Sequence, residues 1–240
     1  MKTGLIIKKA IFAGVVAALV SVSAFSEGYD PITGSSADKR MLDAQALVEK
    51  LYAEQEYERS LIIYQRELAP FGDKYAQYMV GFMNYRGQGV EANRPAALAW
   101  FRLAAERSDP PFIEARDALF NIMPLEEVVE SNQIFVELWR QLSDSQLLLE
   151  LVRQDLKILR ARGSTRVPGS NASSISMVNV QDGNNDSAEY YRRVRTRMEA
   201  RLSYLQSNVE IVDIELNDDS AVKQHLEQEI REQVAALDMR

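Results

Sequence analysis

The sequence predicts an all-α protein in which a short α/α solenoid is followed by a long antiparallel helical hairpin with coiled-coil character. Three observations lead to this prediction. Apolar residues recur at three- and four-residue spacings from residue 39, a Gly-x-Gly corner separates two such stripes, and beyond residue 128 the apolar period becomes seven. The 240 residues, 46% of them apolar, are enough for one ordinary domain or two small ones.

Composition excludes several kinds of chemistry. The chain has no cysteine and one histidine, so disulfides, iron–sulfur clusters, cysteine-ligated zinc and multi-histidine metal sites cannot be built. We expect no cofactor and no metal. The histidine, His225, is expected on a solvated helix surface. A formal charge of −7 argues against a nucleic-acid partner or general affinity for anionic membranes, because the long-range field repels phosphate.

Residues 1–24 are predicted to be a secretory signal peptide. Lys2, Lys8 and Lys9 precede an apolar run over residues 10–22, and small residues follow. Cleavage is expected after Ala24, with Ser26 as a second candidate. The alternative is an uncleaved anchor, although the run is shorter than the roughly 20 residues that a spanning helix needs. Cleavage leaves 216 residues, a charge of −10 and no stable membrane span. Export without cysteine predicts a periplasmic protein.

The mature chain is predicted to begin with a disordered lead-in over residues 25–38, followed by a solenoid over residues 39–142. Apolar stripes predict one helix pair on either side of a polar corner at residues 54–56, and a second pair over residues 75–85 and 94–107. A further helix and a capping segment that includes Trp139 are expected to complete the array, because repeats need neighbours to bury their faces.

The second helix pair carries a specific motif. Its matching positions are Gly81, Gly87, Gly89, Val90, Ala97, Trp100, Phe101, Ala104 and Ala105. In residue type and spacing the pair resembles the SEL-one-like repeat, a relative of the tetratricopeptide repeat. Three positions depart from the family pattern: Asn84 replaces Tyr, Asn93 replaces Asp and Ser108 replaces the closing Gly. The resemblance implies a stack of helical hairpins that acts as a scaffold for other proteins.

The spacing of this motif also has a physical explanation. Gly81 lacks a side chain where two helices must approach closely, while Gly87 and Gly89 allow the positive backbone angles of a sharp turn. Asn93 is placed to cap the second helix, at whose start Pro95 is tolerated. Small and aromatic side chains of the second helix are expected to nest against its neighbours: Ala97, Trp100, Ala104 and Ala105.

Heptads dominate the rest of the chain. One set runs from Val128 to Leu159 and a second from Tyr191 to Leu216, which is typical of helices packed at a shallow angle. Between them, residues 163–186 are rich in Ser, Asn and Gly and predict a flexible loop. These features predict a helical hairpin over residues 143–240, with Asp218, Asp219 and Ser220 as caps for a last helix.

Basic residues are concentrated in the predicted hairpin. Residues 153–201 carry ten basic and five acidic side chains in a chain that is otherwise acidic. In a hairpin, Arg160, Arg162, Arg192 and Arg193 would converge at the loop end. They are either solvated arginines near helix ends, or a docking surface for an acidic partner, an acidic patch of a second copy or an anionic envelope surface.

The sequence predicts a non-catalytic periplasmic adaptor rather than an enzyme. The solenoid groove around Tyr78, Asn84, Tyr85 and Trp100 is expected to bind another protein of the bacterial envelope. The alternative for Tyr78 and Trp100 is a place in the core, because aromatic residues at helical spacing are mostly core residues. The alternative is a homo-oligomeric envelope protein assembled through the C-terminal heptads. A third reading, hydrolase or penicillin-binding activity, would follow from resemblance to a cysteine-rich branch of the repeat family. It fails here because this chain lacks that branch's cysteines.

Overall fold

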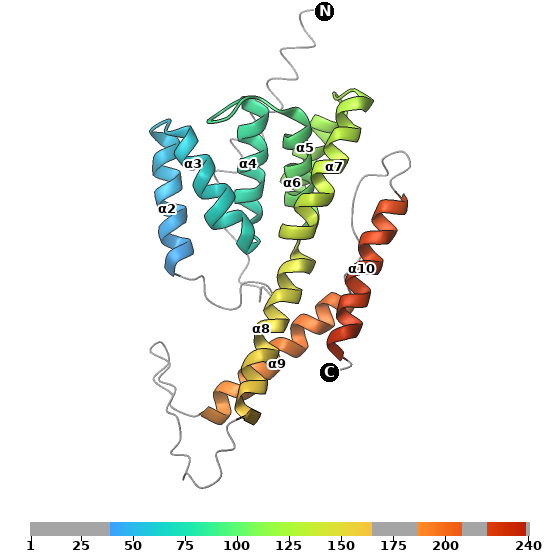
Figure 1. Cartoon of the computed structure of the whole chain (residues 1–240). Coiled ribbons are helices and arrows are strands. Elements are labelled where there is room, and N and C mark those ends of the chain that lie inside the picture. The colour runs from blue at the N-terminus through green and yellow to red at the C-terminus, as the bar shows by residue number, and fades with distance from the viewer. Residues whose placement is uncertain (1–38, 165–186, 208–219, 239–240) are drawn as a thin grey trace, which may run out of the picture. The chain divides into compact units, whose positions relative to one another are not determined.

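The computed structural model describes residues 39–164, 187–207 and 220–238, and every regular element in these ranges is helical (Figure 1). The predicted all-α fold class is thereby confirmed. In chain order the elements are α2 (Lys39–Ala53), α3 (Tyr57–Ile63), a π-helical turn (Tyr64–Leu68), a 3-10 turn (Ala69–Phe71), α4 (Lys74–Arg86), α5 (Arg94–Ala104), a second 3-10 turn (Ala105–Arg107), α6 (Pro110–Phe120), α7 (Leu125–Leu142), α8 (Asp144–Ser164), α9 (Ser187–Ser207) and α10 (Ser220–Asp238). The predicted signal peptide, the lead-in, residues 165–186 of the predicted loop, and Asp218 and Asp219 lie outside the described residues.

The described helices form two compact units. Unit 1 contains α2 to α7 and the start of α8 as far as Leu147, and unit 2 contains α8 from Leu148 together with α9 and α10 from Ala221. Each unit has its own set of buried apolar side chains. Among the described residues, no helix is both long and apolar enough to cross a bilayer.

Unit 1 begins with two helical hairpins. α2 packs on α3 across the polar corner, where Gln55 has a φ of +64°. α4 then packs along α5, and glycine allows their close approach: a Cβ on Gly81 would lie 2.7 Å from Cδ1 of Phe101 and 3.1 Å from the carbonyl oxygen of Ala97. Gly87 and Gly89 take φ values of +70° and +73° in the corner between these helices. The corner is therefore a turn that side-chain-bearing residues adopt only with strain.

The helix α5 is the centre of unit 1. It packs on α4, α6 and α7, and nine of its eleven residues are buried. Its sequence is apolar around most of its circumference, which suits a helix covered on all sides. The side chain of Asn93 accepts a hydrogen bond of 2.8 Å from the backbone N–H of Ala96 and so caps the helix. Across α5 and α7, Arg102 lies 3.9 Å from the ring centre of Phe135 and donates to Asn132.

The end of α5 contains a non-glycine residue in a left-handed conformation. Ser108 has a φ of +60° and closes the 3-10 turn Ala105–Arg107 through its N–H. Ser108→Gly is expected to stabilise the fold by about 0.5 kcal/mol, because relief of left-handed strain exceeds the entropy that glycine adds to the unfolded chain. Urea unfolding measures the change. Ser108→Ala keeps the Cβ and should gain nothing; a destabilised glycine variant would contradict the prediction.

A buried ionic cluster joins both ends of the α4–α5 hairpin to the junction of α7 and α8. The ammonium of Lys74, whose side chain is 3% exposed, lies 2.8 Å from Glu106 Oε2 and 3.0 Å from Asp144 Oδ1. Arg107 Nε donates to Asp144 Oδ2 at 2.7 Å, and the N–H of Asp144 donates to Glu106. Here Ser143 is extended, with φ −65° and ψ 154°, and separates the two helices. The cluster thus fastens the first turn of α8 to unit 1.

Unit 2 is held together by a charged pair within an apolar core. Arg201 Nη1 donates to Asp155 Oδ2 at 2.6 Å, and both side chains are almost fully buried. Arg197 also donates to Asp155. Figure 1 shows the end of α8 and the start of α9 at the same end of unit 2, so these helices run antiparallel. The last helix, α10, buries Leu226, Ile230 and Val234, and its Gln233 accepts from Arg153 of α8.

The buried stripe of α9 differs from the predicted heptads. The predicted set, counted from Tyr191 in alternate steps of four and three, makes Arg195 a core position. Arg195 is exposed, whereas its neighbour Val194 is buried. The buried residues of α9 include Val194, Arg201 and Leu205, and Arg201 is buried as an ion-pair partner of Asp155. The predicted positions Val209, Val212 and Leu216 lie outside the described residues.

Candidate interaction surface

Two of the aromatic residues predicted to line a partner groove lie in the core. The ring of Tyr78 is 1% exposed and stacks on Phe101 with ring centres 5.2 Å apart. It also contacts Phe112 of α6 at 5.5 Å. Trp100 is 5% exposed. Because both side chains are almost wholly buried, a partner can reach little of either, and the groove predicted around Tyr78 and Trp100 is not formed by them.

The hydroxyl of Tyr78 is buried and has no hydrogen-bond partner among the described residues. Burial, reinforced by the nearby Tyr75 and Tyr52, raises the pKa of Tyr78 well above its ordinary value. The phenol therefore stays neutral and packs as an aromatic core side chain.

The other two residues of the predicted groove lie half-buried at the end of α4. The amide of Asn84 donates to the carbonyl of Val80 at 2.7 Å, one turn earlier in the same helix. Its backbone carbonyl accepts from the N–H of Asn93, which ties the end of α4 to the start of α5. Tyr85 faces an open pocket of about 640 Å³. Of the four predicted groove residues, Tyr85 alone lines this pocket.

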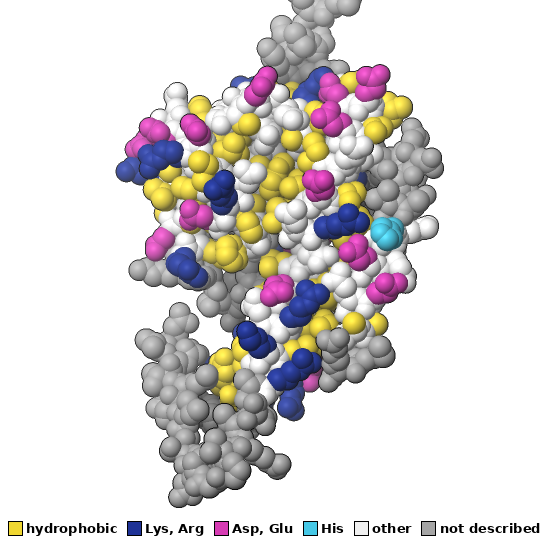
Figure 2. All heavy atoms as spheres, in the orientation of Figure 1, with side chains coloured by type: hydrophobic (Ala, Val, Ile, Leu, Met, Phe, Trp, Pro, Cys, Tyr) yellow, Lys and Arg dark blue, Asp and Glu magenta, His cyan; other side chains and the backbone are white. Residues whose placement is uncertain are grey.

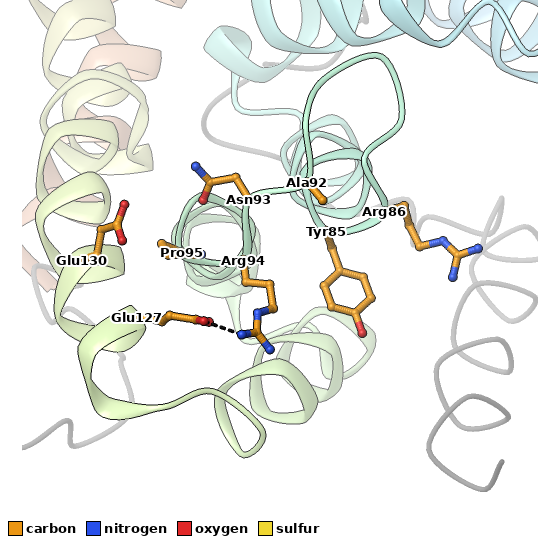
Figure 3. A pocket seen from close by; sticks show the side chains of 8 residues that line it. All are labelled: Tyr85, Arg86, Ala92, Asn93, Arg94, Pro95, Glu127 and Glu130. Carbon is orange, nitrogen blue, oxygen red and sulfur yellow. Dashed lines mark hydrogen bonds and ion pairs between the residues drawn. The ribbon is translucent and has the colours of Figure 1, made fainter. Parts of the chain in front are cut away.

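The pocket is formed by three segments of unit 1 (Figure 3). Its lining residues come from the end of α4, the corner and first turn of α5, and the first turns of α7: Tyr85, Arg86, Ala92, Asn93, Arg94, Pro95, Glu127 and Glu130. An ion pair between Arg94 and Glu127 links α5 to α7 across the pocket. The Arg94 side chain is 44% exposed, so solvent limits the contribution of this pair to about 1 kcal/mol or less. The pair orients the two side chains more than it stabilises the fold.

Beside the pocket, the start of α7 exposes apolar and acidic side chains together. We call this surface the α7 rim; it consists of Ile122, Leu125, Glu126, Val129 and Glu130. Leu125 is 64% exposed and Val129 is 49% exposed. The carboxylates of Glu126 and Glu130 are exposed and form no ion pair within the described chain. Figure 2 shows yellow and magenta side chains side by side where α7 begins. Exposed apolar patches with polar borders are typical of interaction surfaces.

The arginines predicted to converge at the hairpin end belong to unit 2. Arg160, Arg192 and Arg193 are exposed, and Arg192 pairs with Glu189. The side chain of Arg162 lies outside the described side chains, although its backbone belongs to α8. The antiparallel course of α8 and α9 brings these segments to one end of unit 2 (Figure 1).

The described residues offer no arrangement typical of a metal site. No group of three His, Cys, Asp or Glu side chains within them is placed to hold a metal ion. His225 lies exposed on α10, as its surroundings in the sequence predicted.

Sequence patterns did not identify Arg94, Glu127 or Glu130 as surface-forming residues. Arg94 and Glu127 are 33 residues apart, and they meet because α7 packs on α5. One signal could have found this surface: apolar residues in the first turn of α7 lie off the buried face of that helix. The signal can be recognised only once the buried face is known. Val128, Ser131, Phe135 and Trp139 form that face.

Comparison with protein-family models identifies a Sel1 repeat at residues 74–109, which span α4, the glycine corner, α5 and the following turn. The predicted resemblance to the SEL-one-like repeat is therefore confirmed. No curated protein and no solved structure matched the chain. Sel1 repeats form a helical repeat family that commonly mediates protein–protein interaction and is generally non-catalytic.

Proposed function

From the Sel1 repeat and the exposed surface beside it, we propose that this protein is a non-catalytic adaptor that binds another protein of the bacterial envelope. The observation that supports the proposal most directly is the α7 rim. It combines large exposed apolar side chains with unpaired carboxylates at the edge of an open pocket. Protein interfaces combine an apolar centre with a polar border in this way.

The chemistry of the α7 rim defines the partner segment that it fits. Leu125 and Val129 are one helical turn apart and offer an apolar contact, while Glu126 and Glu130 offer negative charge on the same turns. An amphipathic segment with basic side chains complements both features. Tyr85 extends the surface into the pocket with an amphipathic ring, a residue type enriched at interfaces.

The proposed location is the periplasm. The support comes from the sequence of residues 1–24, in which lysines precede an apolar run and small residues follow. Fusion of residues 1–30 to a reporter that is active only after export tests this part of the proposal. A reporter signal that disappears when the apolar run is interrupted by two aspartates supports export. An inactive reporter would refute it.

Site-specific photo-crosslinking in intact cells tests the adaptor role. A crosslinking side chain placed at Val129 or at Tyr85 is expected to capture the same protein, because both positions border one surface. The same group at Glu58, an exposed residue of α3, serves as the matched control and should not capture it. Leu125→Asp should abolish capture from Tyr85 without unfolding the chain, since this side chain is mostly exposed. Equal capture from Glu58, or none from the α7 rim, would refute the proposal.

A further inference from the structure

Unit 2 carries a positively charged surface that the adaptor proposal does not use. Five exposed cations make up this basic face: Lys157, Arg160, Arg192, Arg193 and Arg195. The described parts of α8 and α9 in unit 2 contain nine basic and four acidic residues, an excess of five positive charges. Figure 2 shows dark blue side chains gathered over these helices.

The position of the basic face follows from the Asp155 ion pairs. Since Asp155 of α8 binds Arg197 and Arg201 of α9, the residues that follow Asp155 lie beside the residues that precede Arg197 in this antiparallel pair. Lys157 and Arg160 are thereby brought to the same end of unit 2 as Arg192 and Arg195. The pairing of Asp155 with Arg197 and Arg201 thus brings positively charged surface side chains of the two helices together.

Local acids neutralise little of this charge. Four acids lie in α8 and α9 of unit 2. Asp155 is occupied by Arg197 and Arg201, Glu150 lies near Arg153, and Glu189 pairs with Arg192. The fourth, Glu199, is exposed and forms no ion pair among the described residues. Lys157, Arg160 and Arg195 have no acidic partner among the described residues. Like charges held close together repel one another, so an anionic ligand at this face is favoured.

The number of exposed apolar side chains on unit 2 distinguishes an acidic protein from an anionic membrane as the partner of the basic face. The large apolar side chains that are clearly exposed all belong to unit 1, and the described residues of unit 2 contribute none. A protein interface depends on a few buried apolar or aromatic anchors. Anionic headgroups of a bilayer attract clustered Lys and Arg without such anchors.

Aromatic residues at the start of α9 fit the same kind of surface. Tyr190 and Tyr191 lie immediately before the arginines, are half-buried, and pack edge to face with ring centres 5.4 Å apart. Tyrosine rings are enriched at the level of lipid headgroups, where one edge is apolar and the hydroxyl is solvated. We propose that the basic face of unit 2 binds the anionic phospholipid headgroups of a membrane surface.

This inference goes beyond the proposed adaptor function and does not depend on it, because the basic face and the α7 rim belong to different units. A chain with both properties holds its protein partner beside a membrane. Binding is electrostatic, so it weakens as salt concentration rises.

Vesicle co-sedimentation of residues 25–240, the chain expected after cleavage of the signal peptide, tests the proposal. The vesicles contain about one third phosphatidylglycerol in phosphatidylcholine, an anionic fraction sufficient for electrostatic attraction, and pure phosphatidylcholine vesicles are the neutral reference. The triple variant K157Q/R160Q/R195Q removes three unpaired cations. Each cation contributes about five-fold in affinity, so the triple variant is expected to bind anionic vesicles about 100-fold more weakly.

A matched variant controls for net charge. K50Q/R59Q/R66Q removes three exposed cations from α2, α3 and the π-helical turn of unit 1 and should bind within about three-fold of the original chain. All variants lack residues 1–24, so the apolar run and the lysines of the predicted signal peptide cannot bind the vesicles. Circular dichroism verifies that each variant is folded. Equal losses in both variants, equal binding to neutral vesicles, or equally tight binding to polyglutamate or to a DNA oligonucleotide would overturn the proposal.

Discussion

Gly89→Ala is expected to destabilise unit 1 by about 3 kcal/mol or more, whereas Gly87→Ala should cost about 1 kcal/mol. Both residues have a positive φ, so both variants share the cost of a left-handed backbone. Only Gly89 lacks room for a side chain. Its Cβ would lie 2.6 Å from the carbonyl carbon of Tyr57 and 2.7 Å from the nitrogen of Glu58, and backbone atoms cannot move aside cheaply.

Gly87 is the matched control for this prediction. A Cβ there would meet the Cβ of Ala92 at 3.3 Å, a contact that a small shift relieves. Urea unfolding of the two variants measures the difference in the free energy of unfolding. Equal destabilisation by both substitutions would show that the turn conformation alone matters, and would contradict the predicted backbone clash.

The clash at Gly89 also affects how the two helical hairpins of unit 1 pack on each other. The corner of the Sel1 repeat touches the preceding hairpin directly, because Tyr52 donates a hydrogen bond of 3.0 Å to Gln88 and Gly89 lies against the start of α3. Gly89 is therefore required for packing between hairpins as well as for the turn. We expect its substitution to loosen α2 and α3 from the repeat.

Asp144→Asn is expected to cost about 3 kcal/mol, the largest effect of any single substitution in the buried ionic cluster. Burial by itself raises the pKa of Asp144, but the Lys74 ammonium and the Arg107 guanidinium outweigh it and hold this pKa below its ordinary value. The folded protein thus stabilises the charged carboxylate. An amide at this position leaves the buried Lys74 and the half-buried Arg107 with less compensating charge.

Glu106→Gln tests the carboxyl group of the same cluster whose pKa is shifted in the opposite direction. Burial raises the pKa of Glu106, and the nearby Lys74 only partly offsets that effect. The folded state therefore disfavours this charge, and the neutral amide should cost less than about 1 kcal/mol at neutral pH. The glutamine oxygen retains the geometry needed to accept from Lys74 and from the N–H of Asp144. A loss of unfolding free energy as large as that of Asp144→Asn would contradict the raised pKa of Glu106.

The two carboxyl groups also predict opposite pH dependence. The depressed pKa of Asp144 gives a contribution that is present above its unfolded pKa of about 4 and is lost as the pH falls through the lower, folded value. The raised pKa of Glu106 gives a penalty that develops as the pH rises above its unfolded value. The stability of Glu106→Gln relative to the original chain should therefore improve from pH 4 to pH 7, which urea unfolding at both pH values measures. A constant difference would contradict it.

Several features could be predicted because they depend on local backbone chemistry. The positive φ angles at Gly87 and Gly89 and the cap at Asn93 lie within a few residues of the groups that cause them. Likewise, alternation of apolar residues at helical spacing is enough to predict an all-α fold. The candidate site was less predictable, since Tyr85 was identified but Arg94, Glu127 and Glu130 were not.

The sequence by itself determined the helices, the glycine corner and the excess of positive charge in α8 and α9, because each depends on neighbouring residues or on composition. Only the tertiary structure decided which faces are buried. It decided between core and groove for Tyr78 and Trp100, which both lie in the core. It also exposed Leu125 and Val129, and joined Lys74 to Asp144 across 70 residues of chain. The physical reason is that burial and ion pairing depend on which helices pack together, and a local sequence pattern does not specify which helix packs on which.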